Sequence, residues 1–149
     1  MKYTQGFMGR VFVARLDDGE SIKKEIENIC IREGLRDAIV YLVGGLRDEK
    51  REGKLVGMGL VVPKNNKPNF LFHASIGNMQ DTFVGQNDET VVADQIVEAI
   101  VVELGGVDAM RFFDEKLGID ALTIVGPGSD GKEEIQMKGA FGTSSYSKK

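Results

Sequence analysis

His73 is the only histidine in the chain, so any catalytic or metal-binding role for an imidazole falls on this residue. A Ser-His-Asp or Cys-His arrangement within one chain would have to use it as the base. Because Cys30 is the only cysteine, a metal site built solely from His and Cys is excluded within one chain. A metal ion at His73 would need carboxylates, Gln86, water or copies of His73 from other subunits. The alternative is a structural histidine, half-buried and hydrogen-bonded within a strand.

Arg47 and Asp48 follow a Gly44-Gly45 pair and begin a charged stretch. Seven of the eight residues from 47 to 54 are charged, which is typical of a solvated hairpin or loop. Alternatively, the two side chains form an ion pair or contact an anion beside exposed backbone amides. Both residues are therefore candidates for ligand binding.

Residues 126–131 match the pattern Gly-x-Gly-x-x-Gly after a predicted strand. A dinucleotide site also needs a helix, a second strand and an acidic residue about 20 positions later. Only 18 residues follow Gly131, and Pro127 removes one of the N–H groups that would hold a phosphate. The segment is better interpreted as a flexible turn.

The composition excludes several classes of protein. The chain has 149 residues, of which 42% are hydrophobic and 28% charged, so it suits one globular domain. The net charge of −4 disfavours a general attraction to DNA or anionic lipid, and the lysines form no basic stripe. No apolar run reaches the length of a membrane span, and the start lacks the pattern of a signal peptide. With one cysteine and hence no intrachain disulfide, we expect a cytoplasmic protein without membrane contact.

The positioning elements follow from periodicity and turn residues. Helical spacing of apolar residues after the Asp17-Asp18-Gly19 turn predicts a helix from residue 22 that ends at Gly34. A second helix is predicted from Asp108 to Gly118, because Met110, Phe113 and Leu117 have helical spacing. Strands are predicted over residues 10–16, 38–43, 55–62, 70–76, 82–86, 91–104 and 121–125. For 91–104 the spacing also fits a helix, but the β-branched content favours a strand.

Two of these strands have informative faces. Residues 38–43 are apolar throughout, which predicts that both faces of this strand are covered. In the next strand, Gly57 and Gly59 lie opposite the face formed by Val56 and Met58. Alternate glycines leave a smooth surface that another backbone or a ligand can approach closely.

This order of elements predicts an α+β fold, a mainly antiparallel sheet flanked by two helices. We expect a single domain over residues 1–125. Residues 126–149 form a partly flexible extension rich in Gly, Ser and Lys, which Ile135, Met137, Phe141 and Tyr146 could attach to another surface.

Several segments together resemble one family. They are residues 9–13 with the turn at 17–20, and residues 44–48, 72–77, 102–107 and 111–118. In order and spacing, over roughly residues 7–125, the pattern is similar to the PPC ("plants and prokaryotes conserved") domain. The resemblance implies an α+β fold, largely an antiparallel sheet flanked by helices, that assembles as a homotrimer. Prokaryotic members carry a DNA-binding label that follows plant relatives, in which a separate AT-hook contacts DNA. This chain has no AT-hook.

The resemblance also bears on metal binding. Many prokaryotic members carry a His-x-His pair on one strand and a third His on the next. The matching positions here hold Leu71, His73 and Gln86. Leucine cannot ligate a metal and glutamine is a poor ligand for transition metals, so a divalent cation would depend on His73.

Three hypotheses for function follow. The first, from the resemblance, is a DNA-binding or DNA-associated regulatory protein. The second is a homotrimer that binds a small ligand or metal near Arg47, Asp48, His73 and Gln86. The third is an enzyme of unknown reaction, which is disfavoured because one histidine allows no nucleophile–base pair without help across an interface.

Overall fold

The computed structural model describes residues 1–49, 52–77, 82–85 and 89–125. Gln86 and the extension at 126–149, with its glycine pattern, lie outside the described residues. The elements are β1 (Phe7–Asp17), α1 (Ile22–Glu33), β2 (Ala38–Arg47), β3 (Glu52–Lys64), β4 (Lys67–Ile76), β5 (Thr82–Gly85), β6 (Val92–Gly105), β7 (Ala109–Asp114) and β8 (Ile119–Ile124).

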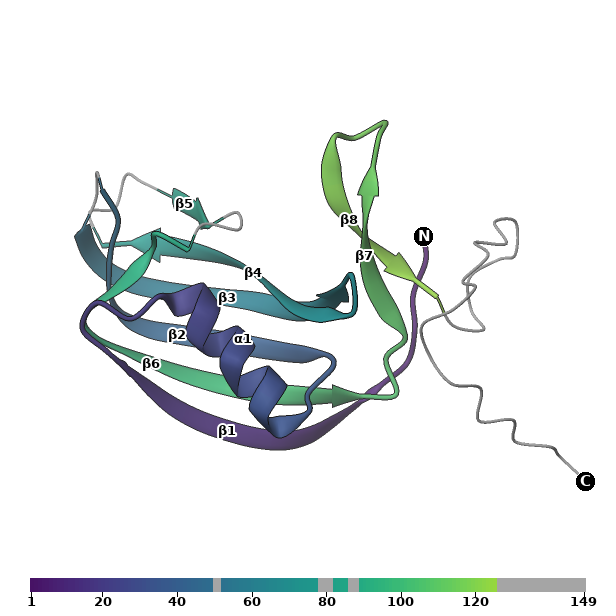
Figure 1. Cartoon of the computed structure of the whole chain (residues 1–149), viewed down its shortest axis with the longest axis horizontal. Coiled ribbons are helices and arrows are strands. Elements are labelled where there is room, and N and C mark those ends of the chain that lie inside the picture. The colour runs from purple at the N-terminus through teal and green to yellow at the C-terminus, as the bar shows by residue number, and fades with distance from the viewer. Residues whose placement is uncertain (50–51, 78–81, 86–88, 126–149) are drawn as a thin grey trace, which may run out of the picture.

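Six strands form one sheet in the order β1-β6-β2-β3-β4-β5, and every neighbouring pair is antiparallel. β7 and β8 form a separate hairpin that projects from one end of this sheet (Figure 1). The charged stretch after β2 is confirmed as a hairpin, because Arg47 pairs with Glu52 across it. The antiparallel α+β architecture is also confirmed.

α1 lies against one face of the sheet and begins and ends at capping residues. The Ser21 side chain accepts a hydrogen bond from the Lys24 N–H, and Gly34 adopts the left-handed conformation after the last turn, with φ of 66°. The Glu27 carboxylate contacts the buried Lys23 ammonium and accepts a hydrogen bond from the Phe70 N–H at 2.9 Å. This carboxylate therefore joins α1 to β4. No helix in the described part of the chain is long and apolar enough to cross a membrane.

The hydrophobic core lies between α1 and the sheet. It contains Ile22, Ile26 and Cys30 of the helix and the inward residues of the central strands. Gly59 faces this side, and a Cβ there would lie 2.3 Å from the Leu71 carbonyl oxygen. The predicted close approach of a backbone is thus confirmed, but the approaching backbone is β4 of the same chain.

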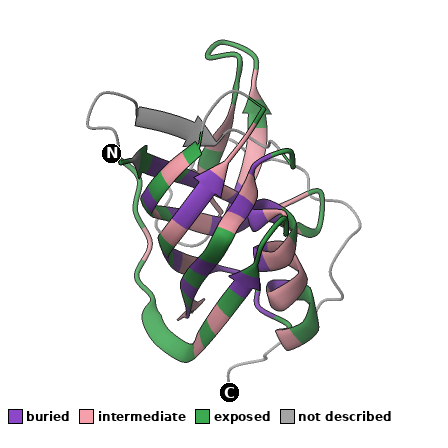
Figure 2. Cartoon of the chain, turned by 90° about the vertical axis from the view of Figure 1, so that its left-hand side faces the viewer, coloured by how far each residue is buried: buried purple, intermediate pink, exposed green. Residues whose placement is uncertain are grey.

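The opposite face of the sheet is uncovered in this chain. Tyr41 and Val43 on β2 are 45% and 47% exposed, so the prediction that both faces of this strand are covered is wrong for the single chain. Buried and exposed residues alternate along the strands, as Figure 2 shows. We call this surface the open face, and its exposed apolar residues are Val11, Val13, Tyr41, Val43, Val56, Met58, Ile96 and Ile100.

The second predicted helix is wrong, because its residues form β7 and the following turn. Ala109 and Met110 are buried, but Phe113 and Leu117 are 64% and 65% exposed and so share no buried helix face. Asp114 accepts hydrogen bonds from the backbone N–H groups of Lys116 and Leu117, and Gly118 has φ of 67°. These contacts form a turn that pairs β7 with β8.

Candidate functional site

Arg47 lies at the end of β2 and binds two carboxylates from distant parts of the chain. Its Nη1 donates to Asp18 Oδ1 at 2.7 Å and to Asp94 Oδ1 at 3.1 Å, and its Nη2 donates to Asp18 Oδ2 at 3.3 Å. Asp18 belongs to the turn between β1 and α1, and Asp94 belongs to β6. One guanidinium therefore holds three elements together.

The electrostatics of this cluster favour the charged forms. Asp18 Oδ1 also accepts a hydrogen bond from the Gln95 N–H at 2.9 Å. The hydrogen bonds from Arg47 and from this N–H hold the pKa of Asp18 below its ordinary value. The hydrogen bond to Asp18, with that to Asp94, raises the pKa of Arg47. Two carboxylates share one cation, so the cluster carries a net negative charge.

The backbone beside the cluster is irregular. Gln95 has φ of 64°, a left-handed conformation that is uncommon outside glycine, and the β2–β6 register shifts between Gly44 and Leu46. A Cβ at Gly45 would lie 2.2 Å from the Asp94 carbonyl oxygen. Glycine is needed here because the bulge in β6 presses against β2.

A polar hollow of about 320 Å³ lies beside the bulge. It is lined by Gly45, Glu52, Gly53, Lys54, Gly77, Asp94 and Gln95. Glu52, Lys54 and Asp94 give it charges of both signs. The hollow suits a small polar ligand. Together with the Arg47 cluster it forms the candidate site.

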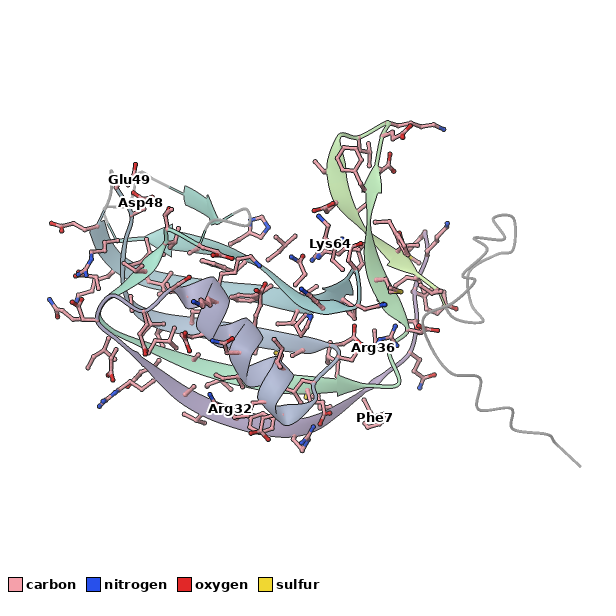
Figure 3. All side chains as sticks on the ribbon, in the orientation of Figure 1. Phe7, Arg32, Arg36, Asp48, Glu49 and Lys64 are labelled. Atoms are coloured by element: carbon pink, nitrogen blue, oxygen red, sulfur yellow. The ribbon has the colours of Figure 1, made fainter. Side chains whose placement is uncertain are left out.

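The predicted site residues lie in two places. Asp48 directly follows Arg47 at the β2–β3 hairpin, where Figure 3 labels it beside Glu49. His73 pairs with Met58, six positions along β3 from the Glu52 that pairs with Arg47. At about 3.3 Å per residue, these six positions correspond to a distance of roughly 20 Å along the strands between Arg47 and His73. The structure therefore places Arg47 and Asp48 together, and His73 elsewhere.

His73 is exposed on the open face, between the buried residues Phe72 and Ala74 of β4. Leu71 is its neighbour on that face, because side chains two apart on a strand point the same way. Among the residues that the structure describes, no group of three or more His, Cys, Asp or Glu side chains could hold a metal ion. The described part of one chain therefore does not fit a metal site around His73.

Two features of the sites were not found from the sequence. One is the pairing of Arg47 with Asp18 and Asp94, which lie 29 and 47 positions away. The other is an apolar hollow of about 590 Å³ on the open face, lined in part by Val13, Tyr41, Val43, Val56 and Ile100. The signal for this apolar hollow was that residues 38–43 of β2 are apolar throughout, so that both faces of the strand carry apolar side chains.

The fold and its sites define an α+β domain built on one antiparallel sheet, with an apolar face that a single chain leaves uncovered. Residues 3–105 match the Plants and Prokaryotes Conserved (PCC) domain, also written PPC. The chain belongs to this family. Comparison with curated protein sequences gives no significant match.

Solved structures with the same fold come from archaea and bacteria. A plant- and prokaryote-conserved protein of Pyrococcus horikoshii has a TM-score of 0.71 and 23% identity, covering 85% of this chain and 100% of its own. A metal-containing protein of Archaeoglobus fulgidus has a TM-score of 0.67 and 23% identity, with coverages of 83% and 99%. A protein of Bacteroides thetaiotaomicron, named as a candidate for DNA binding, has a TM-score of 0.60 and 12% identity, with coverages of 80% and 97%.

Proposed function

We propose that this chain is the subunit of a homotrimeric DNA-associated regulatory protein. The open face is the observation that supports assembly of several subunits. Its eight exposed apolar residues span β1, β6, β2 and β3 and form one surface. A contiguous apolar surface of this extent is typical of a protein–protein interface. Homotrimeric assembly, as the family resemblance implies, would cover it.

Light scattering on the purified full chain tests the assembly. We expect a mass near three times 16.3 kDa. Val43→Glu combined with Val56→Glu places two charges on the open face and should reduce that mass. Ile31→Glu is the matched control, because Ile31 is 63% exposed on α1, on the other side of the sheet. A wild-type mass of 16.3 kDa, or equal masses for all three proteins, would contradict assembly through this face.

Association with DNA rests on family membership and on the name of the Bacteroides relative. The electrostatics of one chain give it little support, because Arg10, Arg36 and Arg47 are each bound to carboxylates. A surface that attracts phosphate would therefore have to be gathered from several subunits. Affinity for duplex DNA comes largely from neutralised phosphates, so binding should weaken steeply as salt rises.

A titration against labelled duplexes, one rich in A·T and one of mixed sequence, tests this function between low and physiological salt. Binding that persists near physiological salt and falls with added salt supports it. Absence of binding at low salt, or an affinity that does not change with salt, would refute it. A preference for the A·T-rich duplex would add evidence for sequence recognition.

A second candidate function is binding of a small ligand or a metal ion by the assembled protein. The hollow on the open face favours a ligand at a subunit interface, and the Archaeoglobus relative is named for its metal. Copies of His73 from several subunits would be the way to complete a metal shell. Metal analysis of the wild type and of His73→Ala tests this, because a metal-free wild type would end the metal hypothesis.

A further inference from the structure

The hollow on the open face has the size and the lining of a site for a small molecule. Its volume of about 590 Å³ lies within the range of roughly 300–1,000 Å³ that is usual for ligand pockets. Such pockets are mostly apolar and contain a few polar groups that orient the ligand. Among the lining residues, the polar side chains are those of Arg15, Tyr41 and Glu98. These three groups therefore decide which ligand the hollow suits.

The register of the strands places the carboxylate of Glu98 near the ring of Tyr41. Tyr41 of β2 lies opposite Ile100 of β6, and Glu98 lies two positions before Ile100 on the same face of the sheet. Tyr41 and Glu98 are therefore diagonal neighbours, about 7–8 Å apart. Val43 lies opposite Glu98, and Val56 lies opposite Val43. The carboxylate and the aromatic ring thus stand beside each other among apolar side chains.

The nearest cation does not neutralise Glu98. Arg15 of β1 lies directly opposite Glu98 in the register of the sheet. Its Nη2, however, forms an ion pair with Asp17 Oδ1 at 2.9 Å. Within the part of the chain that the structure describes, the Glu98 carboxylate has neither a hydrogen bond nor an ion pair. The lining therefore has one carboxylate without a partner, and this charge complements a cation.

We propose, on the basis of the second candidate function, that this hollow binds a small organic ammonium ion with an apolar body. The ammonium group of the ligand lies between the Glu98 carboxylate and the face of the Tyr41 ring. An aromatic ring attracts a cation over its face, and the attraction grows when water is excluded. The apolar body of the ligand contacts Val43, Val56 and Ile100.

Ligands of other charge fit this lining less well. A carboxylic acid of the same shape would be repelled by Glu98 and would compete with Asp17 for Arg15. A neutral molecule would contact the apolar walls, but it would remove water from the Glu98 carboxylate without replacing it by a partner. The charge of the ligand is therefore the property that Glu98 selects.

Titration of the full chain with three small molecules, followed by NMR chemical shifts, tests this selection. The probes are phenethylamine, phenethyl alcohol and phenylacetate, which share one apolar body and differ in charge. The amine should bind about fivefold more tightly than the alcohol, and the acid most weakly. Equal affinities for the amine and the alcohol would leave ligand binding standing and refute the charge of the ligand. Absence of binding by all three would contradict both.

Two variants locate the binding site of the amine. Glu98→Gln keeps the shape of the side chain without its charge, so the affinity for the amine should fall about fivefold while that for the alcohol stays constant. Tyr41→Leu keeps an apolar side chain without the ring and should weaken the amine more than the alcohol. Glu115→Gln is the matched control, because it changes the net charge equally at an exposed position in the turn after β7. Equal losses in the two Glu→Gln variants would show a general attraction to an acidic protein and contradict the proposal.

Light scattering distinguishes the small ligand from a cationic side chain of a second copy. If such a side chain occupied the hollow, Glu98→Gln would weaken the contact between subunits and lower the mass of the assembly. We expect the mass of Glu98→Gln to equal that of the wild type while its affinity for the amine falls. A lower mass for this variant would show that Glu98 serves the contact between copies, and would overturn the proposal.

Discussion

At the scale of single residues, Asp37, which directly precedes β2, is unusual because its carboxyl group is buried. It is 2% exposed, and its Oδ1 has no hydrogen-bond partner among the described residues. Burial raises its pKa to about 6. The Arg36 guanidinium, whose Nε lies 3.7 Å from Asp37 Oδ2, opposes this rise, and Asp108 adds to it. At neutral pH the folded protein therefore holds a poorly solvated negative charge.

Asp37→Asn is expected to increase the free energy of unfolding at pH 7 by about 1–2 kcal/mol, since it removes this charge. The pKa of Asp37 is higher in the folded chain than in the unfolded chain. The contribution of Asp37 to wild-type stability should therefore fall as the pH rises from about 4 to about 6, and stay at the lower level above that. The gain in the variant should vanish near pH 4.

Urea unfolding at pH 4 and pH 7, at one protein concentration, measures this difference. Glu115→Gln is the control, because Glu115 is an exposed carboxylate in the turn after β7. A gain of equal size at both pH values would rule out the charge of Asp37 as its cause.

Arg47 offers a second prediction at this scale. Arg47→Met leaves Asp18 and Asp94 without their shared cation, so the midpoint of thermal unfolding should fall by on the order of a few degrees at pH 7. The pKa of Asp18 is lowered in the folded chain, so this stabilisation is present above the ordinary pKa of aspartate and is lost as the pH falls. The effect of the substitution should therefore shrink toward pH 3.

Arg15→Met is the matched control for this measurement, because Arg15 forms an exposed ion pair with Asp17 outside the cluster. Exposed pairs of this kind contribute little. An effect of Arg15→Met as large as that of Arg47→Met would show that the cluster has no special role in stability.

At the scale of elements, the turn of the β7–β8 hairpin depends on one carboxylate. Asp114 Oδ1 accepts hydrogen bonds from the Lys116 N–H at 2.9 Å and the Leu117 N–H at 3.1 Å. Asp114→Ala removes both bonds and should lower the free energy of unfolding by about 1 kcal/mol, whereas Asp114→Asn keeps an acceptor and should cost less. Denaturant unfolding of the two variants checks this order. Equal losses would mean that the bonds do not stabilise the hairpin.

The sequence predicted the elements that local patterns determine. α1 begins at Ile22 and ends at the Gly34 cap, as the turn residues and the helical spacing predicted, whereas the cap at Ser21 was not predicted. The segment from 91 to 104 forms a strand because β-branched residues suit a sheet. The prediction of a second helix was wrong because the helical spacing of Met110, Phe113 and Leu117 does not show whether these side chains are buried. The β7–β8 pairing and the turn at Asp114 determined the structure there.

The candidate site was less predictable, because it depends on contacts between distant residues. The glycine pair and the charged stretch in the sequence identified Arg47 and Asp48 as candidates for ligand binding, and the structure places both residues at the β2–β3 hairpin. Their surroundings depend on β6 lying beside β2, which brings Asp94 to Arg47. No local pattern specifies that pairing, nor the bulge at Gln95 that makes Gly45 necessary.

At the scale of the whole molecule, the uncovered face of the sheet links stability to assembly. One face packs against α1, while the other exposes apolar residues of four strands. If subunits cover this face, folding and association are coupled, and the folded state gains stability as the protein concentration rises. The midpoint of thermal unfolding of the wild type is therefore expected to increase with concentration.

Val43→Glu combined with Val56→Glu separates the two contributions. In an assembled protein these charges would be buried without partners, so the variant should dissociate. In a single chain, Val43 and Val56 are 47% and 66% exposed, so the same charges would remain in water at little cost. We therefore expect a lower midpoint for the variant that no longer depends on concentration. Ile31→Glu should retain the wild-type dependence. A wild-type midpoint that is constant across a hundredfold concentration range would show that the open face is not covered by other copies.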